Sequence, residues 1–137
     1  MISRALFLSI AFYFFSDWLP ADEGHGHTHR KADRLKVLSF SGTGWYRHPE
    51  TAAINRWLVL LGDKRGFDVD VSEDGKDLRS KQIARYQVVI LNNANELVSV
   101  LSEEERKSVE DWYAGGKGIV ALHAALVHQQ DWKWLSD

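Results

Sequence analysis

The chain contains no cysteine among its 137 residues. This absence excludes disulfide bonds, thiolate metal ligands and a cysteine nucleophile, so any chemistry has to come from other side chains. An excess of one charge is also missing, because 17 basic residues stand against 19 acidic ones and the formal net charge is -2. No basic stripe alternates with aromatic residues, and we therefore expect no nucleic-acid partner.

Long apolar runs are scarce as well, and the run at residues 5–15 is too short to cross a bilayer core as a helix. It follows a single positive charge at Arg4 and leads through a polar break to a small-residue exit at Ala21. This layout is typical of a secretory signal peptide. Residues 1–21 are therefore predicted to be a signal peptide of a secreted or periplasmic protein without a permanent membrane anchor.

Residues 22–34 are polar and charged without apolar periodicity, which is typical of a solvated linker. His25, His27 and His29 alternate within it, and in an extended chain their rings would lie on one side about 7 Å apart. At that spacing the three rings could bind one metal ion together. We favour the alternative, a polar leader without a metal centre, because histidines without a fixed backbone make only an adventitious site.

Hydrophobic residues make up 45% of the chain and include six tryptophans, which is enough for a core. From residue 35 onward, apolar segments of strand type alternate with segments of helical periodicity. The predicted strands are 35–41, 67–71, 88–91 and 119–122, and the predicted helices are 50–63, 80–84 and the stretch from 102 to 113. This alternation predicts an α/β domain over residues 35–137 with a doubly wound parallel sheet.

The predicted strands differ in their surroundings. Residues 67–71 alternate apolar and acidic side chains, as an outer strand would, whereas residues 88–91 and 119–122 are continuous apolar runs that we expect to be covered on both faces. Such sheets usually have five or more strands. We therefore expect the chain to hold the front part of a domain that is incomplete at its C-terminus.

Helix faces and helix ends can also be predicted. One buried face of the first helix is indicated by Ala53, Ile54, Trp57, Leu58 and Leu61. The later helix has a capping box at Ser102 and Glu105, and its buried stripe is predicted to be Val109, Trp112 and Tyr113. Gly66 is expected to end the first helix, and Asp131 to cap a short final one.

The predicted strand 119–122 ends at His123, at the edge of the sheet where open α/β folds bind ligands. The loops 42–48 and 92–96 leave the same edge, so their polar residues should meet this ring. The candidate catalytic residues are His123 and His48 as acid or base and Arg47 as a stabiliser of negative charge. The candidate ligand-binding residues, whose flat rings and polar groups suit a sugar, are Thr43, Trp45, Tyr46, Asn92, Asn93, His128, Asp131 and Trp132.

Most of these candidates have a structural alternative. His48 would begin a helix before Pro49, Arg47 would pair with Glu50, Trp132 would pack in the core, and the asparagines would make turns. His123 has the stronger case, because a buried strand rarely ends in an imidazole without a polar partner.

The segment from Ser41 to Gly44 resembles the phosphate loop of flavodoxins, in which hydroxyls and backbone amides hold a phosphate at a helix N-terminus. Tyr46 replaces the hydroxyl residue expected two places after Gly44. FMN binding is therefore the lesser alternative, and the cofactor is otherwise left open.

Several short motifs occur in a fixed order: Lys36-Val37-Leu38, Phe40-Ser41, Tyr46-Arg47-His48, Tyr86 to Val89, Trp112-Tyr113, Gly115-Gly116 and Ile119 to His123. In their order and spacing, residues 35–134 resemble the ThuA-like (trehalose-utilisation) family. The resemblance implies a flavodoxin-like fold similar to class I glutamine amidotransferases, with His123 near the turn that carries their cysteine and with Arg47, His48 and His123 lining a pocket.

The resemblance also implies a role in disaccharide or keto-sugar metabolism. Amidotransferase chemistry is excluded because the chain has no cysteine. After His123, members of the family often have a small polar residue and soon afterwards an aspartate, whereas this chain continues with Ala124 to His128. A metal site or an acid/base pair would therefore need His128 or Asp131 in place of that aspartate. Two functions remain open, a sugar-modifying enzyme and a non-catalytic carbohydrate-binding or scaffold domain, and so does the oligomeric state.

Overall fold

The computed structural model describes residues 34–137. The predicted signal peptide, and the predicted linker up to residue 33, lie outside the described residues. The last linker residue, Arg34, donates to the Phe67 carbonyl at 3.0 Å and forms an ion pair with Asp68 at 3.2 Å. Within residues 34–137, none of the helices combines the length and the apolarity needed to span a bilayer.

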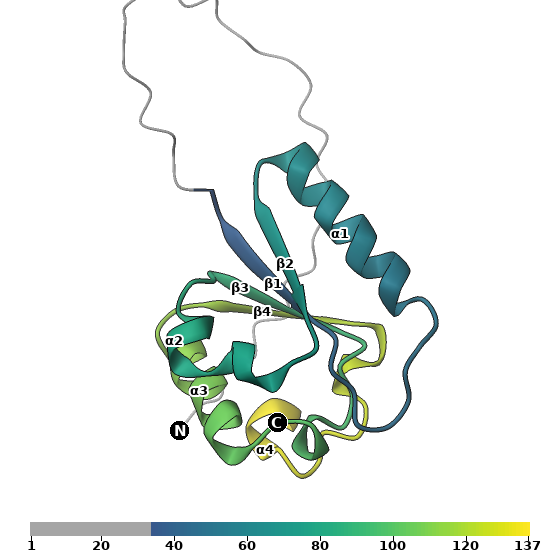
Figure 1. Cartoon of the computed structure of the whole chain (residues 1–137). Helices are drawn as coiled ribbons and strands as arrows, with labels where there is room; N and C mark the ends of the chain where they lie inside the picture. Colours follow the sequence, from purple (N-terminus) through teal and green to yellow (C-terminus); the bar gives the residue numbers. More distant parts are fainter. Residues whose placement is uncertain (1–33) are drawn as a thin grey trace, which may run out of the picture. The chain divides into compact units, whose positions relative to one another are not determined.

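Within residues 34–137, four parallel strands form one sheet in the order β2-β1-β3-β4 (Figure 1). Their bounds are β1 Lys36–Phe40, β2 Asp68–Ser72, β3 Val88–Asn92 and β4 Gly118–Leu122. The two central strands are β1 and β3, whose apolar side chains are largely buried on both faces. The order matches the first four positions of flavodoxin-like sheets. The predicted doubly wound α/β fold is confirmed.

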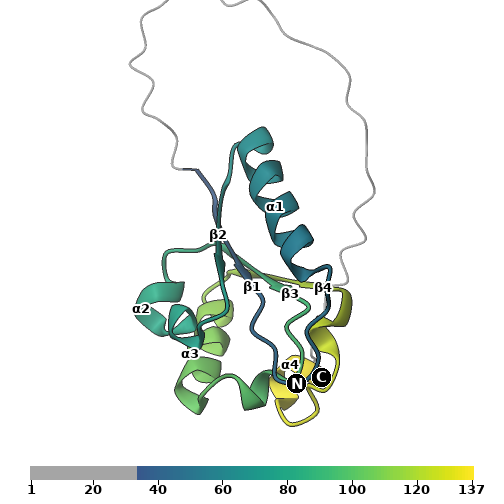
Figure 2. The ribbon, with the colours of Figure 1, turned by 45° about the vertical axis from the view of Figure 1, so that its right-hand side comes forward.

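Helices lie on both faces of the sheet, with α1 on one side and α2 and α3 on the other (Figures 1 and 2). The α-helices are α1 Thr51–Arg65, α2 Ser80–Ile83, α3 Glu103–Ala114 and α4 Lys133–Ser136. The part of the chain that the structure describes also has three short 3-10 helices, η1 Gly75–Leu78, η2 Leu97–Ser99 and η3 His123–Leu126. The predicted helices 50–63 and 80–84 thus agree with α1 and α2 to within two residues, and the helix predicted between 102 and 113 is α3.

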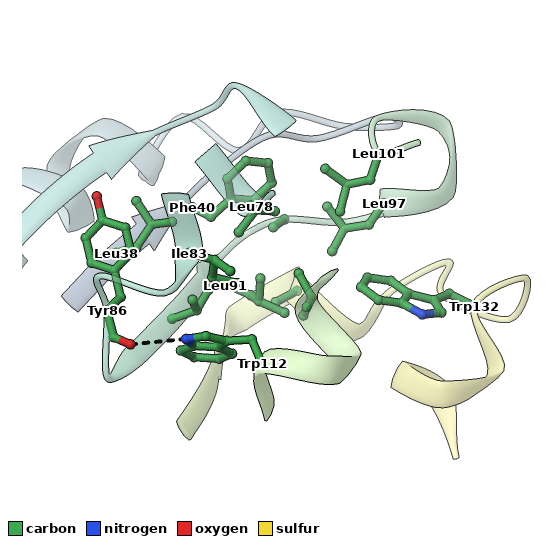
Figure 3. Close-up of a cluster of buried hydrophobic side chains, with 14 residues drawn as sticks. Leu38, Phe40, Leu78, Ile83, Tyr86, Leu91, Leu97, Leu101, Trp112 and Trp132 are labelled. Carbon is green, nitrogen blue, oxygen red and sulfur yellow. Dashed lines mark hydrogen bonds between the residues drawn. The ribbon is translucent and has the colours of Figure 1, made fainter. Parts of the chain in front are cut away.

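The larger hydrophobic core lies between the sheet and α3 (Figure 3). Leu38, Leu91 and Trp112 meet there, and the indole of Trp112 donates to the main-chain carbonyl of Tyr86 at 3.1 Å. A smaller core of Val37, Leu58 and Ile90 lies under α1. Successive residues of a strand point to opposite faces, which is why neighbours in β1 and β3 belong to different cores.

The predicted buried face of α1 is partly wrong. Trp57 is 58% exposed and Ala53 is also exposed, whereas Thr51, Asn55 and Gly62 are buried. The reason is that the strand ends beneath α1 carry polar side chains that Asn55 contacts, and that the helix comes very close to the sheet at Gly62. A Cβ atom at Gly62 would lie 2.7 Å from the Phe67 carbonyl.

The prediction that residues 119–122 are covered on both faces is also wrong. In the described part of the chain β4 is an edge strand, and Val120 is 43% exposed on the face that α1 covers elsewhere. The other edge strand, β2, is the outer strand that its alternating aspartates predict.

The predicted start of α3 and the predicted end of α1 are confirmed, whereas the predicted burial of Tyr113 and the predicted cap at Asp131 are wrong. The capping box of Ser102 and Glu105 is present, and Gly66 ends α1 in the left-handed conformation with φ 82°. Tyr113 is 45% exposed instead of buried. Asp131 does not cap α4, since the N-cap residue is Trp132 and makes no side-chain cap bond.

Candidate functional site

Two segments at the carboxyl edge of the sheet, the loop after β1 and the turn after β4, bring five ring side chains together. Ring centroids are separated by 4.5 Å between His48 and His123, by 4.8 Å between Tyr46 and His48, and by 4.4 Å between Trp45 and His128, each pair nearly perpendicular. Trp45 and Tyr46 are also neighbours, at 6.2 Å. We call these five residues the ring cluster. The structure therefore joins His48 and His123, as the sequence predicts.

The ring cluster is an open surface. Trp45 is 61% exposed and Tyr46 50% exposed, while His48 is half-buried and His123 exposed. Such an arrangement offers flat apolar faces beside groups that can exchange hydrogen bonds with a ligand. Among residues 34–137, no group of three or more histidine, aspartate or glutamate side chains is placed to hold a metal ion.

The backbone at this edge is unusual. Asn93, Glu96, His123 and His128 have φ between 49° and 57°, in the left-handed region that non-glycine residues rarely adopt. All four follow β3 or β4. Each such residue costs on the order of 1–3 kcal/mol, and they tend to concentrate at functional sites. The left-handed residue His123 directly follows the last residue of β4 and begins η3.

The imidazole of His123 is held by Asn93, whose side-chain oxygen lies 2.6 Å from Nδ1. Asn93 is only 2% exposed, and its amide nitrogen donates to the side-chain oxygen of Asn92 at 3.0 Å. Asn92 is fully buried and donates to the main-chain carbonyl of Thr51. The predicted contacts of Asn92 and Asn93 with a ligand are therefore wrong, because the two amides are enclosed and position His123 instead.

Asn95 fixes the loop that carries Trp45 and Tyr46, a role that the sequence predictions missed. Its side-chain oxygen accepts from the hydroxyl of Thr43 and from the main-chain N–H groups of Trp45 and Tyr46, the latter two at 3.3 and 3.2 Å. Its amide nitrogen donates to the Tyr46 carbonyl at 2.8 Å. The available signal was a third asparagine just after a buried strand. The hydroxyl of Thr43, which is predicted to bind ligand, is thus bonded to Asn95.

A second buried polar group lies beneath the site and was also missed. Asn55 of α1 accepts from the Ser39 hydroxyl at 2.7 Å and from the amide of Asn92 at 2.9 Å, and donates to Ser41 at 3.0 Å. These bonds connect α1 to the carboxyl ends of β1 and β3. They hold α1 against these strand ends.

Arg47 does not join the rings through its guanidinium. It forms an ion pair with Glu73, the residue after β2, at 2.6 Å. Both side chains are about half exposed, at 49%. The partner is thus neither a ligand group nor Glu50, the alternative that the sequence suggested.

Trp132 and Asp131 are not part of the ring cluster. Trp132 is 6% exposed in the larger core and its indole donates to Glu110 at 2.8 Å, so the prediction that its face binds a ligand is wrong. Asp131 is exposed and makes no side-chain hydrogen bond or ion pair to any residue from 34 to 137.

The loop 42–44 does not have the free groups that a phosphate loop needs. The main-chain N–H groups of Gly44, Trp45 and Tyr46 donate to Asn95, and Ser41 is occupied by Asn55. Gly44 is required for packing, because a Cβ atom there would lie 1.8 Å from the hydroxyl of Ser99. The hydroxyl and amide groups of this segment are therefore bonded to protein, and these contacts disfavour the FMN alternative.

A model of the ThuA family, described as trehalose utilisation, matches residues 36–137. The chain belongs to the ThuA family. A solved structure of a ThuA-like protein from Bacteroides uniformis is similar to this ThuA domain with a TM-score of 0.62 and 22% identity, and it covers 82% of this chain. The chain in turn spans 46% of that protein. At this identity the likeness supports the fold alone, and a search of curated proteins finds no match.

Proposed function

We propose that this ThuA domain acts in carbohydrate metabolism by binding a disaccharide or keto-sugar of the trehalose type across the ring cluster. One observation carries the proposal: His123, held by Asn93 in a left-handed turn, stands beside His48 and next to two exposed aromatic faces. Family membership supports the same class of ligand.

The chemistry of the surface suits a neutral polyhydroxylated ligand. The C–H faces of a sugar ring pack against aromatic rings such as Trp45 and Tyr46, while its hydroxyls exchange hydrogen bonds with imidazoles. Arg47, the cation that lies between Tyr46 and His48 in the sequence, forms an ion pair with Glu73. An anionic ligand would therefore gain no free guanidinium from this residue.

His123 or His48 would serve as general acid or base on a sugar hydroxyl, or on a proton next to a carbonyl, if the domain is catalytic. The engagement of Arg47 favours binding without turnover, because the residue expected to stabilise negative charge already has a partner. We further infer a place of action outside the cytoplasm, which the layout of residues 1–21 supports.

Calorimetric titration of the full chain with trehalose and with its 3-keto derivative tests the proposal. Trp45→Ala should weaken binding about tenfold, or about 1.4 kcal/mol, through loss of the stacking face. Trp57→Ala is the matched control, since Trp57 is 58% exposed on α1 and should leave the affinity unchanged.

Product analysis of the same mixtures distinguishes a sugar-modifying enzyme from a non-catalytic binding domain. Turnover that His123→Ala abolishes would identify an enzyme, whereas binding without turnover would identify a binding domain. Failure of both sugars to bind, or equal losses in the Trp45 and Trp57 variants, would refute the proposed site.

A further inference from the structure

We infer that Asn93 is a positioning residue that keeps the neutral imidazole of His123 protonated on Nδ1 and leaves Nε2 as an acceptor. The tautomer follows from the hydrogen bonds within the chain. The ligand class that it selects rests on the proposed function, whereas the tautomer itself does not.

The orientation of Asn92 is settled by a main-chain group. One end of its side-chain amide lies 3.0 Å from the carbonyl oxygen of Thr51, which can only accept a hydrogen bond. That end must therefore be the nitrogen, which also donates to Asn55 at 2.9 Å. The other end of Asn92 is consequently its oxygen, an obligate acceptor.

Asn93 is oriented in turn by Asn92. The end of its amide that lies 3.0 Å from the Asn92 oxygen has to donate, and so it is the nitrogen. The main-chain N–H of Ala124 points to the other end at 3.5 Å, and since it can only donate, it agrees with an oxygen there. The Asn93 oxygen therefore faces His123.

The last step concerns the ring. The Asn93 oxygen is 2.6 Å from Nδ1 of His123, and an oxygen that can only accept requires a proton on that nitrogen. A neutral imidazole has one N–H group, so Nε2 carries a lone pair. In water the neutral ring prefers the opposite tautomer, with the proton on Nε2, so the asparagines reverse the ordinary preference.

A ring in this state selects its ligand. Nε2 accepts from a hydroxyl group or takes a proton from it, but it has nothing to donate to a phosphate or carboxylate oxygen. The site therefore favours neutral ligands rich in hydroxyl groups, such as unmodified sugars, over ligands that present only acceptors.

The tautomer is measurable without a ligand. In the full chain labelled with 15N, ring correlation spectra at pH 8.5, where imidazoles are neutral, distinguish a protonated from an unprotonated ring nitrogen. Signals of His123 are assigned by their loss in His123→Gln. We expect a protonated Nδ1 and a free Nε2, and a wild-type spectrum with the proton on Nε2 would overturn the inference whatever the variants do.

Two variants test the part played by Asn93. Asn93→Ala should shift His123 mainly to the Nε2-protonated form, while Asn93→Asp, whose carboxylate also accepts, should retain the proton on Nδ1. His128 serves as an internal control, because it belongs to the ring cluster but makes no hydrogen bond to Asn93. Its signals should be the same in both variants as in wild type. An unchanged tautomer in Asn93→Ala would contradict the role of Asn93.

Ligand selection is tested in the same sample. Trehalose should shift the Nε2 resonance of His123, and inorganic sulfate, which has only acceptor oxygens at this pH, should not at the same concentration. If trehalose fails to bind while the tautomer is as expected, the proposed function falls and the tautomer stands. If trehalose binds but the proton is on Nε2, the inferred tautomer is refuted and the proposed function stands.

Discussion

At the scale of single residues, three asparagine side chains hold the loops of the candidate site in place. Asn92, Asn93 and Asn95 follow a strand, and the sequence allowed either turns or ligand contacts. In the structure each amide donates with one end and accepts with the other, which lets it connect loops that are far apart in sequence. These side chains position the rings and do not themselves offer a surface to a ligand.

Tyr86 is a second residue with several contacts. Its side chain is buried, and its hydroxyl donates to Asp70 at 2.8 Å while accepting from Arg85 at 2.9 Å. Burial, followed by the hydrogen bond and the negative charge of Asp70, raises the pKa of Tyr86 to about 12, although the charge of Arg85 opposes this. The folded state therefore holds the phenolic proton more tightly than the unfolded state, whose ordinary value is 10.0.

Tyr86→Phe should change the response of the protein to alkali. Stability that depends on the bound proton is fully present below pH 10 and is lost as the pH rises toward 12. We expect the variant to lose about 1 kcal/mol at pH 7, for the hydrogen bond, and to decline less between these pH values than wild type. Urea unfolding at several pH values measures both effects.

Tyr113→Phe is the control for this prediction, because Tyr113 is 45% exposed and no side-chain hydrogen bond involves it among residues 34–137. It should follow the wild-type curve. An alkaline decline in Tyr86→Phe as steep as in wild type would show that another group is responsible.

At the scale of secondary structure elements, the start of α3 connects three segments through Glu105. The carboxylate accepts from the main-chain N–H of Ser102 at 3.0 Å and from Arg79 at 3.1 Å, and η1 approaches it at Gly75. Burial alone would raise the pKa of Glu105. The hydrogen bonds from Ser102 and the ion pair with Arg79 outweigh burial, and the pKa lies below the ordinary 4.5.

Glu105→Gln should destabilise the fold by about 1.5–3 kcal/mol at pH 7, because the amide cannot accept both charge-assisted bonds. The contribution of the carboxylate is present above pH 4.5 and is lost as the pH falls through its lowered pKa. Chemical unfolding at pH 7 and in acid should therefore show wild type and variant converging at low pH.

Glu104→Gln is the matched control for α3, since Glu104 is the exposed neighbour in the same helical turn. It should change stability by only a few tenths of a kcal/mol. A loss in Glu104→Gln as large as that in Glu105→Gln would mean that negative charge in the first turn, and not the buried contacts, stabilises α3.

At the scale of the whole molecule, the two faces of the sheet are unequal. The face toward α3 is covered by a large core that includes Phe40, Leu91 and Trp112, whereas the face toward α1 has a small one and leaves Val120 exposed. The two edge strands differ as well, because β2 carries Asp68 and Asp70 and β4 carries no charge. Charge on an edge strand discourages pairing with other chains.

Leu91→Ala and Ile90→Ala compare the two faces directly. The side chains are isomers at adjacent positions of β3, and both are buried, in different cores. We expect Leu91→Ala to cost about 2–5 kcal/mol and Ile90→Ala distinctly less, because α1 and the strands can relax more easily around the smaller core. Equal losses in urea unfolding would contradict an unequal division of stability.

Much of this architecture could be predicted from local patterns. The parallel sheet, the capping box of Ser102 and Glu105, and the meeting of His48 with His123 depend on periodicity and on the rule that parallel strands end at one edge. The errors at Trp57 and Tyr113 have one cause: a residue at the correct helical spacing is buried only if another element covers it.

The sequence by itself determined the strands, the helices and the order of the motifs that place the chain in the ThuA family, because each depends on residues close together along the chain. Only the tertiary structure decided that Asn93 holds His123, that Asn95 holds the aromatic loop and that Arg47 turns to Glu73. Those contacts join residues distant in sequence, and an amide or guanidinium takes whichever partner the fold brings within hydrogen-bond distance.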